Sequence, residues 1–175
     1  GEAAGQHDQL AARKAFRSVG PSQNRTPAAP PPSGPEYLLV DGYNVIFAWD
    51  ELKKIAVENL DAARRRLMDI LCNYAGYRKC VPILVFDAYR VKGAGREQET
   101  WHNLHVIYPR EAETADMFIE RATHELAKNH RVRVVSSDGA EQIIILGNGA
   151  LRVSARAFER EVRAVEAEIR EFLDQ

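Results

Sequence analysis

Short apolar segments alternate with longer amphipathic segments along the chain from residue 36 onward. The short segments are typical of strands covered on both faces of a sheet, and the longer ones repeat apolar residues at helical spacing. Alternation of this kind predicts βαβ units and an α/β fold with a mainly parallel central sheet. The predicted strands are 37–40, 81–86, 104–108 and 132–135, and the predicted helices are 60–77, 114–129 and one from near residue 154.

Residues 1–35 precede this alternation and have a different composition. Positions 20–35 contain Pro21, Pro27, Pro30, Pro31, Pro32 and Pro35. A segment this rich in proline cannot form a hydrophobic core and is typical of an extended linker. We therefore expect a disordered tail over residues 1–35 and one folded domain over residues 36–175.

The composition of the 175 residues, 45% hydrophobic and 28% charged, is that of a globular protein with a core. No apolar run approaches the roughly 18 residues of a membrane span, and no secretory signal is evident. Cys72 and Cys80 form no CxxC motif, so we expect reduced thiols, a cytoplasmic location and no membrane partner. The net charge of −1 implies that any binding of nucleic acid depends on local basic patches.

Four aspartates occupy the ends of these elements. Asp41, Asp87 and Asp138 follow predicted strands, and Asp116 begins a predicted helix. The carboxyl ends of parallel strands share one edge of a sheet, where ligands bind. Two like charges about 4 Å apart repel by roughly 4 kcal/mol at an effective dielectric of about 20, so a divalent cation explains such a group better than stability does. The chemistry suggested is metal-dependent phosphodiester hydrolysis.

Each aspartate alone also fits an ordinary structural role. Asp41 precedes Gly42 in a strand-to-helix turn, and Asp87 could end a strand. Asp116 suits the dipole in the first turn of a helix, and Asp138 could be an N-cap. Asn44, three residues after Asp41, could orient a ligand. The functional interpretation depends on all four acids reaching the same edge.

The motifs around these acids resemble the NYN domain of the YacP type, a branch of the PIN-like ribonucleases. The resemblance covers residues 37–173 and rests on five segments in order. These are Asp-Gly-Tyr-Asn at 41–44, Val-Phe-Asp-Ala at 85–88 with Val-Lys-Gly at 91–93, Glu-Thr-Ala-Asp at 113–116, Ser-Ser-Asp at 136–138 with Glu-Gln at 141–142, and 147–152 with Ser-Ala-Arg at 154–156.

The resemblance implies a three-layer α/β/α sandwich and RNA cleavage dependent on Mg²⁺ or Mn²⁺. It also implies association with ribosomes, where bacterial members are thought to cut translated mRNA in the A site, and we expect a monomer. Similar domains occur fused behind ribosome-protection-type translational GTPases, so residues 1–35 would be the end of such a partner. Carried over by position, the metal-binding and supporting groups are Asp41, Asp116 and Asp138, a weaker fourth acid Asp87, and the polar residues Asn44 and Ser137.

Basic side chains near these motifs are candidates for RNA binding. Arg90, Lys92 and Arg96 lie in a predicted loop, 88–103, which could grip an RNA backbone or simply be solvated. Arg152 and Arg156 could meet RNA beside the acids or form surface ion pairs.

Three functions fit these patterns. The first is an endoribonuclease in which water attacks an RNA phosphodiester and leaves a 5′-phosphate and a 3′-hydroxyl. The second is a ribosome-binding or RNA-binding module that no longer catalyses. The third is a phosphatase acting on small substrates, but the chain lacks a DxDx[TV] motif after its first strand. It has no GxxxxGK[ST] motif either, which disfavours nucleoside triphosphates.

Overall fold

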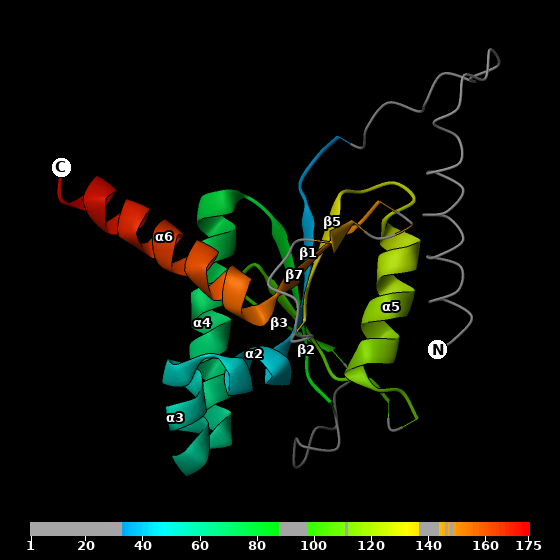
Figure 1. Cartoon of the computed structure of the whole chain (residues 1–175), viewed down its shortest axis with the longest axis horizontal. Helices are drawn as coiled ribbons and strands as arrows, with labels where there is room; N and C mark the ends of the chain where they lie inside the picture. The colour runs from blue at the N-terminus through cyan, green and yellow to red at the C-terminus, as the bar shows by residue number, and fades with distance from the viewer. Residues whose placement is uncertain (1–32, 88–97, 111, 137–143, 146, 148) are drawn as a thin grey trace.

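The structure of the protein is a computed structural model that describes every residue except 1–32, 88–97, 111, 137–143, 146 and 148. In the described part, seven strands form one sheet in the order β3-β4-β2-β1-β5-β7-β6 (Figure 1). The strands are β1 Tyr37–Asp41, β2 Val81–Val85, β3 Gln98–Trp101, β4 Leu104–Ile107, β5 Val132–Ser136, β6 Ile144–Ile145 and β7 Leu151–Ser154.

Five of these strands run parallel and make up the middle of the sheet. β1 lies between β2 and β5, β4 adjoins β2, and β7 adjoins β5, all in parallel pairs. β3 and β6 pair antiparallel at the two edges. The predicted α/β fold with a mainly parallel sheet is therefore confirmed.

Helices cover both faces of the sheet and complete the predicted three layers (Figure 1). One face carries α2 Gly42–Ala48, α3 Asp50–Glu58, α4 Leu60–Arg78 and α6 Ala155–Leu173, and the other carries α5 Ala115–Leu126. Alternate residues of β1 serve the two cores: Leu38 and Val40 pack under the larger group of helices, and Leu39 packs with α5. Burial on both faces explains why β1 and β2, in the middle of the sheet, are nearly continuous apolar runs. No helix among the described residues is long and apolar enough to cross a membrane.

The sequence predicted the central elements but not the shorter ones. The four predicted strands correspond to β1, β2, β4 and β5, and the three predicted helices to α4, α5 and α6. Helices α2 and α3 were missed because α2 follows β1 without an intervening loop. The prediction of a loop over 88–103 was wrong at its end, where residues 98–101 form β3, a mostly exposed edge strand. β7 was missed because it leads directly into α6. The predicted tail falls almost entirely on residues outside the described part, so it stays a prediction.

Candidate active site

The carboxyl end of β1 lies at the point where the sheet order reverses. From β1 the chain passes through α2, α3 and α4 to β2 on one side, and it returns later to β5 on the other side. Asp41 is in register with Val85 of β2, and the preceding Val40 is in register with Val135 of β5. Such a switch point leaves a crevice beyond the strand ends, which is the usual ligand site of an open α/β sheet.

Gly42 makes the sharp turn from β1 into α2 possible. A Cβ atom built there would lie 2.2 Å from Cε1 and 2.5 Å from Cδ1 of the Phe86 ring. Phe86 is fully buried and packs against Tyr43, with ring centroids 5.0 Å apart. Since neither ring can easily move, only glycine lets the chain turn this close to the strand and hold Asp41 at its end.

Asp41 is buried, with 6% of its surface exposed, and it is anchored by Asn44. The Asn44 backbone N–H donates to Asp41 Oδ1 over 3.3 Å, and Asn44 Nδ2 donates to Oδ2 over 2.7 Å. Asp41 is therefore both the N-cap of α2 and an oriented carboxylate. The predicted supporting role of Asn44 has a direct geometric basis in these two bonds.

Burial and neighbouring carboxylates both change the pKa of Asp41. Burial raises the pKa of Asp41 to about 7 from its ordinary 3.8, and the bond from the Asn44 backbone opposes that rise. The pKa is raised further by the charge of Asp116, by a hydrogen bond between the two side chains, and by the charge of Asp87. Three of the four predicted acids are therefore close enough to interact.

Asp116 reaches this position because two side chains fix the beginning of α5. Thr114, the predicted N-cap, accepts a hydrogen bond at Oγ1 from the backbone N–H of Met117 over 3.2 Å. Asp87 Oδ1 accepts from the backbone N–H of Ala115 over 2.7 Å. Asp87 thus ties the end of β2 to α5, and it holds the exposed Asp116 beside Asp41.

The chemistry of this donor set suits a small hard cation. Mg²⁺ prefers oxygen ligands and commonly uses one or two carboxylates, with water and phosphate oxygens completing its shell. Asp41 and Asp116 supply such a pair, and a cation would take the place of the proton that the raised pKa of Asp41 favours. Within the described part of the chain, no cluster of three or more potential ligands is close enough to hold a metal. The predicted residues Asp138 and Ser137 lie outside that part.

Some of the predicted RNA-binding residues lie in the described part of the chain and others lie outside it. Arg90, Lys92 and Arg96 lie outside the described residues. Arg152, the second residue of β7, donates from Nε to Ser136 Oγ over 3.0 Å, so its side chain reaches the carboxyl end of β5. Arg156 is exposed in the first turn of α6.

A polar pocket of about 410 Å³ adjoins the same edge of the sheet, and sequence reasoning did not find it. It lies between the ends of β3 and β4 and the first turns of α5. Its walls come from β3, β4 and α5, all within residues 98–121, and the only local signal was a pair of arginines flanking the Glu-Thr-Ala-Asp motif. The side chains that give it chemical character are Gln98, Tyr108, Arg110, Glu113, Phe118 and Arg121.

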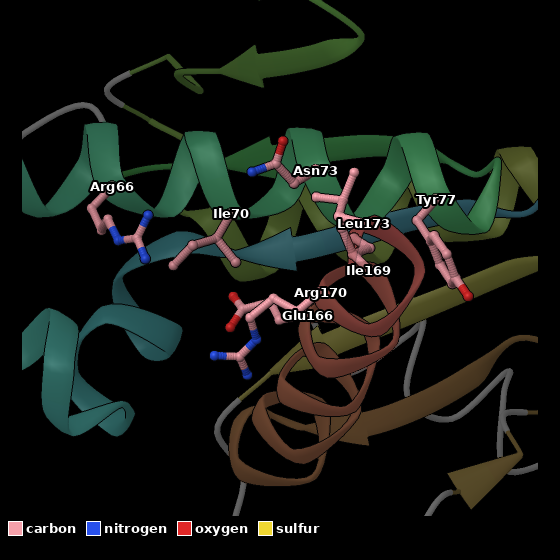
Figure 2. A pocket seen from close by; sticks show the side chains of 8 residues that line it. All are labelled: Arg66, Ile70, Asn73, Tyr77, Glu166, Ile169, Arg170 and Leu173. Atoms are coloured by element: carbon pink, nitrogen blue, oxygen red, sulfur yellow. The ribbon is translucent and has the colours of Figure 1, made fainter. Parts of the chain in front are cut away.

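A second groove, of about 640 Å³, lies in the helical layer between α4 and α6. Figure 2 shows Ile70 of α4 and Ile169 and Leu173 of α6 at this groove, with Arg66 and Glu166 nearby. None of the predicted site residues lines it. Its position away from the acids separates it from the candidate active site.

Acidic side chains at the switch point of a three-layer α/β/α sandwich are consistent with a PIN-like, nuclease-type domain. Comparison with known proteins agrees, because residues 38–175 match the YacP-like NYN domain. The chain belongs to this family. It is 42% identical over 135 residues to the YacP protein of Bacillus subtilis, covering 77% of this chain and 79% of that protein.

Solved structures give the same relationship. The crystal structure of Rae1 (YacP) from Bacillus subtilis is similar to this chain with a TM-score of 0.66 and 40% identity, covering 79% of both chains. A tryptophan-to-leucine mutant of that protein is similar with a TM-score of 0.61 and 37% identity, covering 78% of this chain and 80% of the mutant. The fold and the family predicted from the motifs are therefore confirmed.

Proposed function

We propose that the protein is a metal-dependent endoribonuclease that hydrolyses phosphodiester bonds in RNA, and that its substrate is mRNA on the ribosome. The observation that carries the proposal is the contact between Asp41 and Asp116 at the sheet switch point, where burial and neighbouring acids raise the pKa of Asp41 to about 7. Membership in a family of nuclease-type domains supports the same reaction class.

Asp41 and Asp116, with Asp138, would hold Mg²⁺ or Mn²⁺. When bound, such an ion polarises a phosphoryl oxygen and neutralises the negative charge that develops during phosphodiester hydrolysis. Removing a buried carboxylate from such a set should abolish activity without unfolding the chain, because Asn can keep the capping geometry of Asp41.

The other residues of the site position these acids. Asn44 fixes the direction of the Asp41 carboxylate through its 2.7 Å bond to Oδ2. Asp87 and Thr114 hold the start of α5, and with it Asp116, against the end of β1. Asp87 Oδ1 accepts a backbone N–H and so positions α5, which leaves Oδ2 as the oxygen through which Asp87 would be the weaker fourth metal-binding acid.

The test is to incubate the protein with translating ribosomes and map new 5′ ends on the mRNA, with and without a chelator. We expect cuts that need Mg²⁺ or Mn²⁺, that carry a 5′-phosphate, and that disappear with Asp41→Asn or Asp116→Asn. Asp50→Asn is the matched control, since Asp50 is also an acid in the first turn of a helix, α3, but is not among the groups that shift the pKa of Asp41.

Retained cleavage in both the Asp41 and the Asp116 variants would contradict the assignment of these acids. Ribosome binding without cleavage at any metal concentration would instead favour the alternative function, a binding module with a PIN-like fold. Turnover of a generic phosphomonoester without RNA cleavage would indicate a phosphatase.

A further inference from the structure

One wall of the pocket beside α5 consists of three side chains that contact one another, Arg121, Glu113 and Phe118. Arg121 Nη2 lies 2.9 Å from Glu113 Oε1, and its guanidinium carbon lies 5.2 Å from the centroid of the Phe118 ring. The guanidinium is therefore held by a carboxylate and by an aromatic ring. Two-thirds of the Arg121 side chain, 67%, is nevertheless exposed, so this cationic group remains accessible from the pocket.

The opposite wall combines apolar and polar groups. Pro109 is buried, Tyr108 is half-buried, and the Tyr108 hydroxyl donates to Glu99 over 3.1 Å. Arg110 is exposed at the rim, and Gln98 contributes an amide from β3. The volume of about 410 Å³ falls within the roughly 300–1,000 Å³ of small-molecule sites, which is sufficient for one nucleotide.

The pocket is joined to the acidic edge by direct hydrogen bonds. The Phe86 backbone N–H donates to the Ile107 carbonyl over 3.0 Å, and Asp87 accepts from Ala115, two residues after Glu113. β4 lies two strands from β1, and strands are spaced about 4.8 Å apart, so the end of β4 is on the order of 10 Å from the end of β1. A single RNA strand crossing the acids can therefore extend into this pocket.

We propose that this pocket binds one unpaired nucleotide of the RNA strand next to the scissile phosphate. The base stacks on the Arg121 guanidinium, and Glu113 and Gln98 meet its polar edge. Arg110 faces the adjacent phosphate. Single-stranded RNA is recognised in this way elsewhere, by stacking on aromatic rings or guanidinium planes combined with hydrogen bonds to base edges. The inference deepens the proposed function and rests on it.

The experiment measures the affinity of the whole chain for a short single-stranded oligoribonucleotide at low salt in a chelator, by fluorescence anisotropy. Chelation separates binding from cleavage. The informative variant is Arg121→Lys, which keeps the positive charge but loses the planar group. We expect it to weaken binding about 5- to 10-fold, because the ammonium group of lysine cannot stack on a base. Arg121→Ala should weaken it at least as much.

The matched control is Lys128→Ala, since Lys128 also forms an exposed ion pair, with Glu125 over 3.1 Å, but lies outside the pocket. We expect its affinity to equal that of the unaltered chain. A series of the same oligoribonucleotides should then be tested, each lacking the base at a different position. At one position, removal of the base should lower the affinity of the unaltered chain but leave the affinity of Arg121→Lys unchanged.

Three results would overturn the subsite. They are equal affinities for Arg121→Ala and Lys128→Ala, full affinity for Arg121→Lys, and binding by the unaltered chain too weak to measure. Failure of the nuclease proposal has a different signature, since RNA would then bind with the expected pattern of variants while no metal ion produced a cut.

Discussion

The neighbouring strands β1 and β5 have charged side chains at both ends of the pair. At the carboxyl end the charges are alike, and at the amino end they are opposite. At the carboxyl end, Asp41 lies with two further carboxylates, and burial raises its pKa to about 7. At the amino end, about 10 Å away along β1, Arg133 is in register with Leu38 and is surrounded by opposite charge. It lies 2.6 Å from Glu161 and 3.1 Å from Glu36, the latter at an angle too oblique for a hydrogen bond.

In the amino-end cluster, the charge of Arg133 is balanced by side chains of the same chain, although its Nε forms no hydrogen bond. Arg133 Nη2 donates to the Tyr74 hydroxyl over 2.6 Å, and that hydroxyl donates to Glu161 over 2.7 Å. The guanidinium carbon also lies 6.0 Å from the centroid of the Phe158 ring. Here the unlike charges compensate one another, whereas the acids at the carboxyl end are held together by the fold alone. The difference fits our proposal that one end stabilises the domain and the other binds a metal ion.

The largest effect we expect is on stability, at the amino end. Arg133→Met leaves the partly buried Glu36 and Glu161 without their partner. Breaking this pair should cost about 3 kcal/mol, the lower end of the range for buried pairs, because the three side chains are 15% to 28% exposed. Urea denaturation should show this loss in the free energy of unfolding at neutral pH. The double variant Arg133→Met with Glu161→Gln should recover part of the loss. A loss below about 1 kcal/mol would mean that the cluster is effectively a surface pair.

The second prediction concerns the carboxyl end, where the free energy of unfolding should depend on pH. Folded Asp41 holds its proton up to about pH 7, while the unfolded chain releases it near 3.8, so the folded state binds more protons between these values. The stability that this proton contributes is fully present below about pH 4 and is lost as the pH rises through 7. The expected loss between about pH 5 and about pH 8 is about 3 kcal/mol in a chelator.

Asp41→Asn tests this response, because it has no proton to lose. Its free energy of unfolding in a chelator should exceed that of the unaltered chain at about pH 8, and the difference should shrink toward about pH 5. An identical dependence on pH in the two proteins would show that Asp41 titrates normally and that the carboxyl end is not electrostatically strained.

A third prediction concerns the geometry that holds Asp41. Gly42→Ala forces the Phe86 ring to move and should cost about 2 kcal/mol, within the range for overpacked cores. Gly76→Ala is the matched control, since a Cβ there meets nothing within 4 Å inside α4. It should stabilise the chain by about 1 kcal/mol. Thermal unfolding midpoints that move in the same direction for both variants would contradict this account.

The smallest expected effect is at the N-cap of α5. Thr114→Ala removes the acceptor for the Met117 N–H and should cost about 1 kcal/mol, while Thr114→Ser should be nearly neutral. Because Asp116 lies in the same turn, Thr114→Ala should also lower cleavage by a few fold. Unchanged cleavage in the destabilised variant would show that Asp87 alone positions this turn.

The positions of Asp41 and Asp116 at the carboxyl end of the sheet could be predicted from the sequence because the signals for them are local. Strand ends, the Asp-Gly turn and the Thr114 cap are all short-range patterns, and parallel strands necessarily bring their ends to one edge. The interaction of Asp41 with Asp116 follows from that topology. The metal-binding role of these acids stays a prediction, as does that of Asp138, which lies outside the described residues.

The remaining features depend on contacts between distant segments. Asp87 could be placed at a strand end, but its bond to Ala115 spans 28 positions and has no sequence signature. The same is true of Arg133, which meets Glu36, Tyr74 and Glu161 from other elements. The pocket beside α5 needs β3, and a polar, exposed edge strand was indistinguishable from a loop by pattern.

The central claim is that the acids at the carboxyl end exist to hold a divalent cation. The most direct measurement is a calorimetric titration of the metal-free chain with Mn²⁺ near pH 6, in buffers of different ionisation enthalpy. The claim predicts saturable binding that releases a proton, because the ion displaces the one held at Asp41, and weaker binding by at least about 10-fold in Asp41→Asn. Equal affinity in the two proteins, with no proton released, would contradict it.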